Sequence, residues 1–555
     1  MYKFLFFVFS ITAFAQNSYY VDPVNGNNSN NGLSPNTSFS SINIALNVVL
    51  PGDTILLIGT FQNTSYNPNF VFSTVDDPQI WHGENTIRIN NLHGTPNNYI
   101  TIKAYDNNTL LKGDGGNIFR VMNSSYLRIE GFNIEGEVDN MPLSVANALQ
   151  FVYILDNATI NVLDPLPSEI HYRDQDCVSN CTANAVVDGE IYTSLNPNQV
   201  SRPTYFDTRG MYLSNVNHID ILNNHIHHMP GGGLRVSDCE DILIKGNEIN
   251  DCSRRTSGGT HGLVVTKATS TRTTDDYRIK IIGNKIHHNY NEQFSWAPDK
   301  TIITPIIDEG KGISLQRNQT TYNSNGSINV NWENGRIQIA NNICYFNGYS
   351  GIHSNDGNRI DIINNTCYFN SYTQSITLGQ TSTNGGNIGI SIQDGTGHKI
   401  VNNISVIDSN LTKSAIATNI TASQAIFVKD NIIYGTSGPI LTDPDIDAVA
   451  INTQIINPQF ANVSIYDFSL LSSSPAINSA DATYAPVEDY NNDIRDATPD
   501  IGALEYIASL SILPITKKED LRYYTFNNNL YINSTIEISK IEFYDILGKN
   551  YILME

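Results

Sequence analysis

A short phrase that begins with glycine recurs between residues 210 and 394 and sets basic side chains in register. It reads GMYLSN at 210, GLRVSD at 233, GLVVTK at 262, GISLQR at 312, GIHSND at 351 and GISIQD at 389. The residues one and three positions after the glycine are apolar in almost every copy. Alternation therefore predicts a strand that buries these two positions and turns the residue between them outward. The residue before the glycine and the fifth after it are expected on the same outer face.

The outer positions of this phrase carry side chains that bind anions and transfer protons. In chain order they are Arg209, Tyr212, Arg235, Asp238, His261, Lys267, Lys311, Arg317 and His353. Like charges stacked at strand spacing repel, so a fold gains no stability from them. Residues 200–320 hold 14 Lys and Arg against 13 Asp and Glu, whereas the whole chain has a formal charge of −22. This region is predicted to be a site for an anionic ligand. The alternative is that these cations are solvated at the rim of the fold, where they pair with Asp238, Glu240, Asp308 and Glu309.

β-Elimination on a uronate polymer is the chemistry that suits these residues. A base must remove the acidic proton next to the carboxylate, and a Lys or His can do so when neighbouring cations favour its neutral form. The candidates for the base are Lys267, Lys311 and His261. A cation must also stabilise the charge that develops on the carboxylate. Arg209, Arg235 and Arg317 are the candidates for that role, and Arg235 and Arg317 are the preferred ones.

Further substrate contacts are expected around the same face. Arg209, Tyr212 and His353 flank the candidate bases in the repeat. Two long insertions interrupt it at 253–260 and 289–308, and loops on a rigid scaffold commonly bind ligands. They carry Arg254, Arg255 and Trp296, which are predicted to contact the sugar chain. An earlier insertion at about 140–205 is a candidate cleft wall.

Two other functions fit the same residues. A glycoside hydrolase needs two carboxylates about 5–9.5 Å apart, and Asp238, Asp308, Glu309 and Asp356 are the candidates. A non-catalytic adhesin or glycan-binding rod would instead present a flat face lined by aromatic residues. The concentration of Lys, His and Arg favours an enzyme over the adhesin.

A second repeat identifies the scaffold that must position these groups. An apolar segment, an asparagine and another short apolar segment recur, as in IDILNNHIHH at 219 and IDIINNTCYF at 360. Alignment places seven residues in one column: Asn224, Asn247, Asn284, Asn342, Asn365, Asn403 and Asn431. Two of the intervals are 23 residues, a period typical of solenoids. The units contain short strands without helical periodicity, so the fold class is all-β.

These features resemble the right-handed parallel β-helix superfamily of pectate lyases and related polysaccharide enzymes. The segment from Tyr19 to about residue 60 resembles the N-terminal cap of secreted members, with a short helix at 40–49. The segment SPAINSADATYAPVEDYNNDIRDATPDIGALEY resembles their closing segment, at about 474–506. The resemblance implies a Lys or Arg base, often with Ca²⁺ held by acidic residues. Asp238 and Glu309 are the candidate metal ligands.

The two ends of the chain indicate export. Residues 1–16, MYKFLFFVFSITAFAQ, combine a Lys, an apolar run and an A-x-A site, which is typical of a signal peptide. Residues 17–506 form the predicted β-helix domain. The phrase ISKIEFYDILGK within residues 507–555 resembles the sorting domain of the Bacteroidetes type IX secretion system. We therefore expect an extracellular or cell-surface monomer that engages the secretion machinery.

Charge, apolar segments and cysteine spacing limit the kinds of binding partner that the protein can have. The negative charge argues against nucleic acid, which requires a basic footprint. No segment beyond the N-terminal one is long and apolar enough to span a bilayer. The six cysteines have no zinc-like spacing and are interpreted as structural, with Cys344 and Cys367 stacked in consecutive repeats. In the pairs His227-His228 and His287-His288, one ring is expected to pack inward at a turn.

Overall fold

The structure is a computed structural model of the chain. It describes residues 16–63, 84–143, 146, 204–256, 260–268, 275–292, 309–318, 335–355, 357–370, 388–393, 395–408, 415–419, 426–435 and 450–507. It also describes the backbone of several short strand pairs, which are given below. Two compact units are present, residues 1–506 and 507–555. The signal peptide predicted at 1–16 lies outside the described residues except for Gln16, as does most of the insertion at 140–205.

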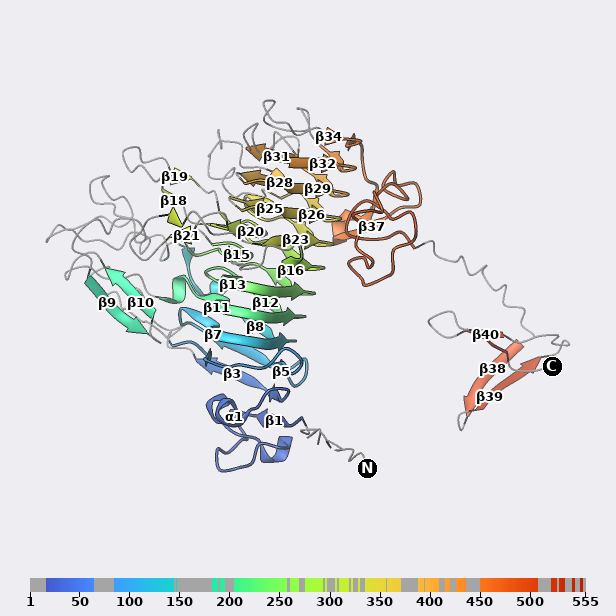
Figure 1. Cartoon of the computed structure of the whole chain (residues 1–555). Helices are drawn as coiled ribbons and strands as arrows, with labels where there is room; N and C mark the ends of the chain where they lie inside the picture. The colour runs from blue at the N-terminus through green and yellow to red at the C-terminus, as the bar shows by residue number, and fades with distance from the viewer. Residues whose placement is uncertain are drawn as a thin grey trace, which may run out of the picture. The chain divides into compact units, whose positions relative to one another are not determined.

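Two parallel sheets make up the first unit (Figure 1). The first sheet contains 18 strands and the second contains 11. Strands of the first sheet are β1 Ser18–Val21, β2 Thr54–Leu57, β4 Ile87–Asn90, β5 Ile100–Ala104, β7 Asn117–Glu130, β11 Arg209–Leu222, β13 Leu234–Lys245, β15 Leu263–Ala268, β16 Tyr277–Ile282, β20 Ile313–Gln316, β23 Arg336–Ala340, β25 Ser350–Ser354, β26 Ile360–Ile363, β28 Ile388–Gln393, β29 His398–Val401, β31 Ile416–Asn419, β32 Ile426–Lys429 and β34 Ala450–Ile451. Those of the second are β3 Thr60–Asn63, β6 Leu110–Gly113, β8 Asn133–Glu135, β12 His225–His227, β14 Glu248–Asn250, β17 Lys285–His287, β24 Ile343–Tyr345, β27 Thr366–Tyr368, β30 Ile404–Val406, β33 Ile432–Tyr434 and β35 Gln454–Ile455.

Each strand pairs in parallel with the equivalent strand of the next turn of chain. The segment β7 pairs with β11, β11 with β13, and β13 with both β15 and β16. In the second sheet β12, β14, β17 and β24 pair in the same order. One turn of chain, called a rung below, therefore contributes strands to both sheets. This arrangement is the parallel β-helix that the two repeats predict, and it confirms the fold class.

The other described elements are short. Antiparallel pairs are formed by β9 Thr182–Val187 with β10 Glu190–Ser194, β18 Ser295–Trp296 with β19 Pro305–Ile306, β21 Thr321–Tyr322 with β22 Ile328–Asn329, β36 Phe460–Asn462 with β37 Asp467–Leu470, β38 Leu521–Phe526 with β39 Asn529–Ser534, and β40 Glu542–Tyr544 with β41 Asn550–Ile552. Helix α1 spans Ile42–Val48, within the predicted capping helix, and Ser41 caps its N-terminus. Single 3-10 turns lie at Pro35–Thr37, Val138–Asn140, Thr204–Phe206 and Val463–Ile465. Among the described residues, no helix has both the length and the apolarity to cross a membrane.

Columns of isoleucine fill the interior. Ile219, Ile242, Ile279, Ile337 and Ile360 are in register on successive strands, and all are 2% exposed or less. Burial of one such side chain contributes roughly 1.5–3 kcal/mol. The phrase that begins with glycine obeys the same rule, because the residues one and three positions after its glycine are buried in all six copies. The alternation predicted from the sequence is therefore confirmed.

The asparagine column forms a continuous hydrogen-bonded ladder. The backbone N–H and Nδ2 of Asn342 both donate to Oδ1 of Asn365 at 2.9 Å, and the same pair of bonds links each neighbouring step. The predicted stacking of Asn342 on Asn365 is confirmed. The left-handed residue of each turn is the one that precedes the ladder asparagine, such as Asn341 at φ +56°. The ladder asparagines therefore satisfy polar groups inside the turn rather than supply its backbone conformation.

The buried cysteines are confirmed as core residues, whereas the histidine pairs differ from expectation. Cys344 and Cys367 are in register, buried and free, as the repeat indicates. Ile226 and Ile286 fill the interior beside the histidine pairs, and His227 lies half-buried on the outer face. The prediction that one histidine of each pair packs inward is therefore wrong. A β-branched apolar residue occupies the only inward position of each three-residue strand.

Candidate active site

The outward positions of the repeat form one column across the first sheet. Register places Arg120, Tyr212, Arg235, Val264, Ser314 and His353 at equivalent positions of β7, β11, β13, β15, β20 and β25. Neighbouring members of such a column lie about 4.8 Å apart. The predicted residues Tyr212, Arg235 and His353 are therefore stacked on the same face. We call this column, with the flanking residues described below, the basic face.

Three arginines surround the ring of Tyr212. The guanidinium carbon of Arg120 lies 4.0 Å from the ring centroid, that of Arg209 5.6 Å and that of Arg235 5.9 Å. Arg120 also donates to the backbone carbonyl of Tyr212 and to Ser214 Oγ. A phenol ring attracts cations through its negative face, so Tyr212 holds together groups that would otherwise repel.

In the described part of the chain, carboxylates pair with the lysines of this face but not with three of its arginines. Among the described residues, no carboxylate lies within 4 Å of the guanidinium groups of Arg209, Arg235 or Arg317. Burial lowers the pKa of Arg235 to about 10, and Arg209 and Arg317 add to that shift through repulsion. The nearby carboxylate of Asp238 opposes the shift. A cluster of cations with so few carboxylates nearby favours the binding of an anionic ligand.

The fifth residue after the glycine of the phrase has a left-handed backbone, which imposes an energetic cost on two of the cations. Lys267 and Arg317 have φ angles of +51° and +53°, in the left-handed region. The equivalent positions of earlier rungs hold Asn215 and Asp238, residue types that tolerate this conformation. A lysine or arginine there costs roughly 1–2 kcal/mol. Lys267 Nζ lies 4.0 Å from Asp238 Oδ1, and about a third of the Lys267 side chain is exposed.

Lys311, Glu309 and His261 form a second, buried cluster beside the column. Lys311 Nζ donates to Glu309 Oε2 at 2.9 Å and lies 4.6 Å from the centroid of the Tyr349 ring. The Lys311 backbone N–H donates to Nδ1 of His261 at 3.2 Å, and the side-chain amide nitrogen of Gln316 lies 2.7 Å from the other ring nitrogen, Nε2 of His261. That nitrogen lies 3.3 Å from Glu309 Oε2. Burial, and then the charge of Lys311, hold the pKa of His261 well below its usual value.

Two of the predicted histidines are too deeply buried for the roles expected of them. His261 is fully buried, and its Nδ1 lone pair is already occupied, so it is not placed to take a proton from a polymer. His353 is 4% exposed and hydrogen bonds to Ser391 and Asn355. Burial lowers the pKa of His353 to about 3. Both rings therefore act as neutral supports within this structure rather than as a base and a substrate contact.

Arg254 and Arg255 belong to a separate ion-paired cluster. Arg254 donates to Glu292 and to Asp139 at 3.1 and 3.0 Å. Arg255 pairs with Glu292 as well, and its Nε donates to the carbonyl of Met141. Because their charge is neutralised within the protein, Arg254 and Arg255 are not expected to bind the substrate. Trp296 lies in β18, but its side chain is outside the described residues, as are Asp308 and Asp356.

The two candidate calcium ligands lie on different rungs. Asp238 lies within β13 near Lys267, whereas Glu309 precedes β20, two rungs further on, and binds Lys311. No group of three or more metal-ligating side chains occurs in the described part of the chain. Calcium binding by these two carboxylates, and their use as a hydrolase pair, stay predictions.

Arg120 is the residue that sequence reasoning missed. It occupies the same column as Tyr212 and Arg235 and is 4% exposed. Its strand has Ile118 where the later copies have glycine, so the phrase used to align the repeats does not detect it. The motif FRVMNS at 119 does preserve the alternation, and that pattern is the signal by which it can be found.

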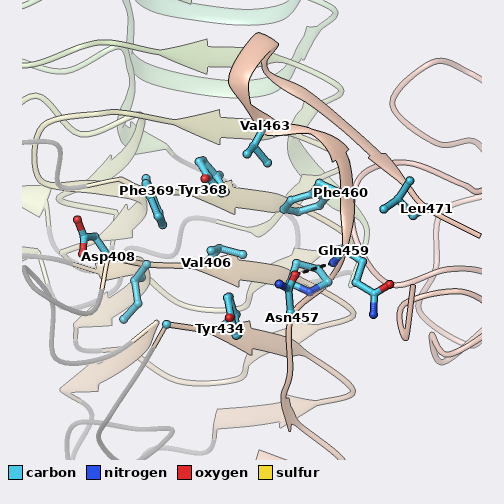
Figure 2. A pocket seen from close by; sticks show the side chains of 13 residues that line it. Tyr368, Phe369, Val406, Asp408, Tyr434, Asn457, Gln459, Phe460, Val463 and Leu471 are labelled. Carbon is cyan, nitrogen blue, oxygen red and sulfur yellow. Dashed lines mark hydrogen bonds between the residues drawn. The ribbon is translucent and has the colours of Figure 1, made fainter. Parts of the chain in front are cut away.

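A cavity occurs elsewhere, against residues 457–471, which precede the closing segment. It has a volume of about 510 Å³ and lies beside Tyr368, Val406 and Tyr434 of the second sheet (Figure 2). None of its lining residues belongs to the basic face. The basic face remains the candidate active site because its residue types can perform proton transfer and carboxylate binding, whereas Asp408 is the one charged residue among the described residues that line the cavity.

Comparisons with known proteins give structural neighbours only. No protein-family model matches the chain, and no curated protein matches it. The chain is similar to a pectate lyase, Pel9A, at 15% identity over 89% of this chain and 97% of that chain, with a TM-score of 0.43. It is similar to a GH136 lacto-N-biosidase from Eubacterium ramulus at 12% identity, over 79% and 68% of the two chains, with a TM-score of 0.41. A rhamnogalacturonan lyase aligns at 13% identity over 87% and 95%, with a TM-score of 0.35.

Proposed function

We propose that this protein is a lyase that cleaves an anionic, uronate-containing polysaccharide by β-elimination at the basic face. The observation that carries the proposal is the group of three arginines, Arg209, Arg235 and Arg317, with no carboxylate within 4 Å of them among the described residues. A fold that needed only stability would pair such charges or place them apart. A polymer that presents a carboxylate on successive sugars supplies the missing negative charge.

The roles follow from where each cation lies. Arg235, held against Tyr212, binds the carboxylate of the sugar to be cleaved and stabilises the negative charge that spreads onto it when the neighbouring proton leaves. The amine of Lys267 takes that proton. The electron pair of the broken C–H bond forms a C=C double bond, and the C–O bond to the leaving sugar breaks. The leaving oxygen then takes a proton from the lysine or from water.

Lys267 is favoured over Lys311 as the base because of accessibility. The side chain of Lys311 is 8% exposed, and its amine donates a 2.9 Å hydrogen bond to Glu309. The side chain of Lys267 is 36% exposed, and its nearest described carboxylate oxygen is 4.0 Å away. Lys267 also occupies the left-handed turn position at an energetic cost, and strain of this kind is commonly retained where a residue serves function. Lys311 is assigned a positioning role.

The test is activity on a panel of uronate polysaccharides, with and without added calcium. Unsaturated products absorb at about 235 nm, as the elimination requires. On the best substrate, Lys267→Ala should lower turnover roughly 100- to 10,000-fold while the circular dichroism spectrum is retained. Lys280→Ala, which removes an exposed lysine outside the basic face, is the matched control. Full activity of Lys267→Ala would refute the assignment of the base, and inactivity across the panel would refute the lyase.

The location of this activity is part of the same proposal. The N-terminal segment directs export, and the protein acts as a monomer on extracellular polysaccharide. The tail at 507–555 engages the secretion machinery. Recovery of the protein from the medium with its N-terminus at residue 16 or 17 supports the first point. Retention of a variant that lacks residues 507–555 inside the cells supports the second, whereas normal export of that variant refutes it.

A further inference from the structure

Two pairs of neighbouring histidines on the second sheet have rings that meet through the same atoms. Nδ1 of His227 lies 2.7 Å from Nδ1 of His228, and Nδ1 of His287 lies 2.8 Å from Nδ1 of His288. Successive residues of an extended strand point to opposite faces, so neighbouring rings ordinarily stay apart. Here the second residue of each pair has a left-handed backbone, with φ angles of +56° and +54°. This bend lets the two rings of each pair meet outside the core.

The other ring nitrogens of the first pair face oxygen atoms. A neutral imidazole carries one proton and one lone pair on its two nitrogens. Nε2 of His227 lies 2.8 Å from Oδ1 of Asn133, an oxygen that only accepts. Nε2 of His228 lies 3.5 Å from Oδ2 of Asp139, whose other oxygen accepts from Arg254. Both rings therefore favour a proton on Nε2, and two Nδ1 lone pairs then face each other. Lone pairs at 2.7 Å repel unless a cation lies between them.

The second pair can satisfy itself without a cation. Nε2 of His287 lies 3.1 Å from Oε1 of Glu248, so this ring also keeps its proton on Nε2. In the described part of the chain, Nε2 of His288 has no hydrogen-bond partner, and its ring packs against those of Tyr345 and Tyr466 at a centroid distance of 5.6 Å. The proton of His288 is therefore free to lie on Nδ1 and to bond the facing nitrogen. The two pairs share a geometry but differ in what they require.

The surroundings of the first pair suit a hydrated divalent cation. Asp251 occupies the position equivalent to His228 on the next rung, about 4.8 Å away. Its carboxylate accepts from Nδ2 of Asn250 at 2.8 Å and pairs with no cation of the described residues. The side chain of His228 is 36% exposed. Water can therefore reach an ion between the two rings, and Asp251 adds negative charge beside it.

The spacing of the two Nδ1 atoms selects the kind of ion. Bonds of about 2.0–2.1 Å from imidazole nitrogen to metal convert the separation of 2.7 Å into an angle of about 80° at the ion. A separation of about 2.9 Å would give the right angle of a square-planar or octahedral site, as Cu²⁺ and Ni²⁺ adopt. A tetrahedral Zn²⁺ site would require about 3.3 Å. Asn133 and Asp139, beyond the ligands, would hold the two Nε2–H groups as acceptors commonly do around metal-bound histidines.

We propose that His227 and His228 bind one Cu²⁺ or Ni²⁺ ion through their Nδ1 atoms, with water in the remaining coordination positions. The site has two protein ligands, which agrees with the finding that larger metal-ligating groups do not occur among the described residues. It lies on the second sheet, whereas the basic face lies on the first. The site does not depend on the lyase proposal, because ion binding is measured without turnover.

The experiment is calorimetric titration of the full-length protein, without a histidine tag, with CuCl₂ and NiCl₂ near neutral pH. One equivalent should bind, and Cu²⁺ should bind more tightly than Ni²⁺. His227→Ala and His228→Ala should each weaken binding more than about tenfold, since loss of a ligand exceeds the usual effect of an outer partner. His288→Ala removes the equivalent residue of the second pair and is the matched control, which should leave the affinity unchanged.

The acceptor beside His227 gives a second pair of variants. Asn133→Ala removes the oxygen that holds the Nε2 proton and should weaken Cu²⁺ binding roughly 10- to 100-fold. Asn133→Asp keeps an acceptor at that place and should retain the affinity. Equal affinities in these two variants would contradict the assignment of the protons to Nε2, on which the facing lone pairs depend.

Two measurements on the unmodified protein guard against variants that fail to fold. The electron paramagnetic resonance spectrum of the Cu²⁺ complex should show coupling to two imidazole nitrogens. Bound Cu²⁺ should also slow carbethoxylation of His227 and His228, located by peptide mass spectrometry, without protecting His288. The site would be overturned by no binding of either ion, by unchanged binding in both His227→Ala and His228→Ala, or by an equal loss in His288→Ala. Coupling to fewer than two imidazole nitrogens, or protection that is absent from His227 and His228, would overturn it as well.

Discussion

Replacement of Asn342 by alanine should destabilise the β-helix strongly, because the side chain makes four buried hydrogen bonds. Its Oδ1 accepts from the backbone N–H and from Nδ2 of Asn284, and its Nδ2 donates to the carbonyl of Ile281 and to Oδ1 of Asn365, all at 2.9 Å. Each such bond contributes roughly 1 kcal/mol net, and a buried N–H left without a partner costs roughly 1–3 kcal/mol. Truncation removes all four bonds and orphans the Asn284 N–H, so the expected loss is at least roughly 4 kcal/mol.

The assay is urea denaturation followed by far-ultraviolet circular dichroism, combined with hydrogen exchange of the peptide around Asn284. Asn342→Ala should lower the unfolding midpoint and accelerate exchange at that turn, since each rung depends chiefly on its neighbours. Asn97→Ala, at an exposed position outside the ladder, is the matched control and should change the free energy of unfolding by less than about 0.5 kcal/mol. A loss below about 1 kcal/mol for Asn342→Ala, within the range of a single net bond, would refute the claim that the ladder is a major source of stability.

Three further outcomes are expected. Arg235→Ala should weaken substrate binding at least about tenfold, whereas Arg235→Lys should retain part of the affinity through its charge, as measured by KM on the best uronate polymer. His353 has a pKa of about 3 when folded against 6.5 when exposed, so the unfolded chain binds the extra proton and stability should fall as pH drops from 6.5 towards 3; this slope, measured by urea denaturation, should be smaller in His353→Asn, and an unchanged slope would contradict the buried neutral ring. Cys344 and Cys367 should resist alkylation until the protein is denatured, as peptide mass spectrometry can show, and rapid labelling of the folded protein would contradict their burial.

The sequence predicts the scaffold well because the scaffold is periodic. Alternation in the phrase that begins with glycine identifies inward and outward positions correctly, and the asparagine column identifies which turns stack. Both patterns follow a local rule that is repeated at every rung, so a single sequence shows each pattern many times. Cys344 and Cys367 follow the same rule, since matching places in two repeats become neighbouring places in the core.

The site was harder to predict because accessibility depends on more than alternation. His261 and His353 occupy outer positions, as predicted, yet both are buried, because alternation gives the direction of a side chain and not how much surrounding protein covers it. Arg254 and Arg255 were grouped with the site by their proximity in sequence, but Glu292 pairs with both. Arg120 was missed because an isoleucine replaces the glycine that marks the later copies. Contacts with residues that are distant in the chain decide the histidine and the Arg254–Arg255 cases.

The mass of the products tests the central claim most directly. A uronate polysaccharide that the protein degrades should yield oligosaccharides lighter by one water than the corresponding hydrolysis products, since elimination breaks the C–O bond without adding water. Arg235→Ala and Lys267→Ala should reduce the amount of these products without changing their mass. Products at the full hydrolysis mass would contradict β-elimination and would identify the protein as a glycoside hydrolase instead.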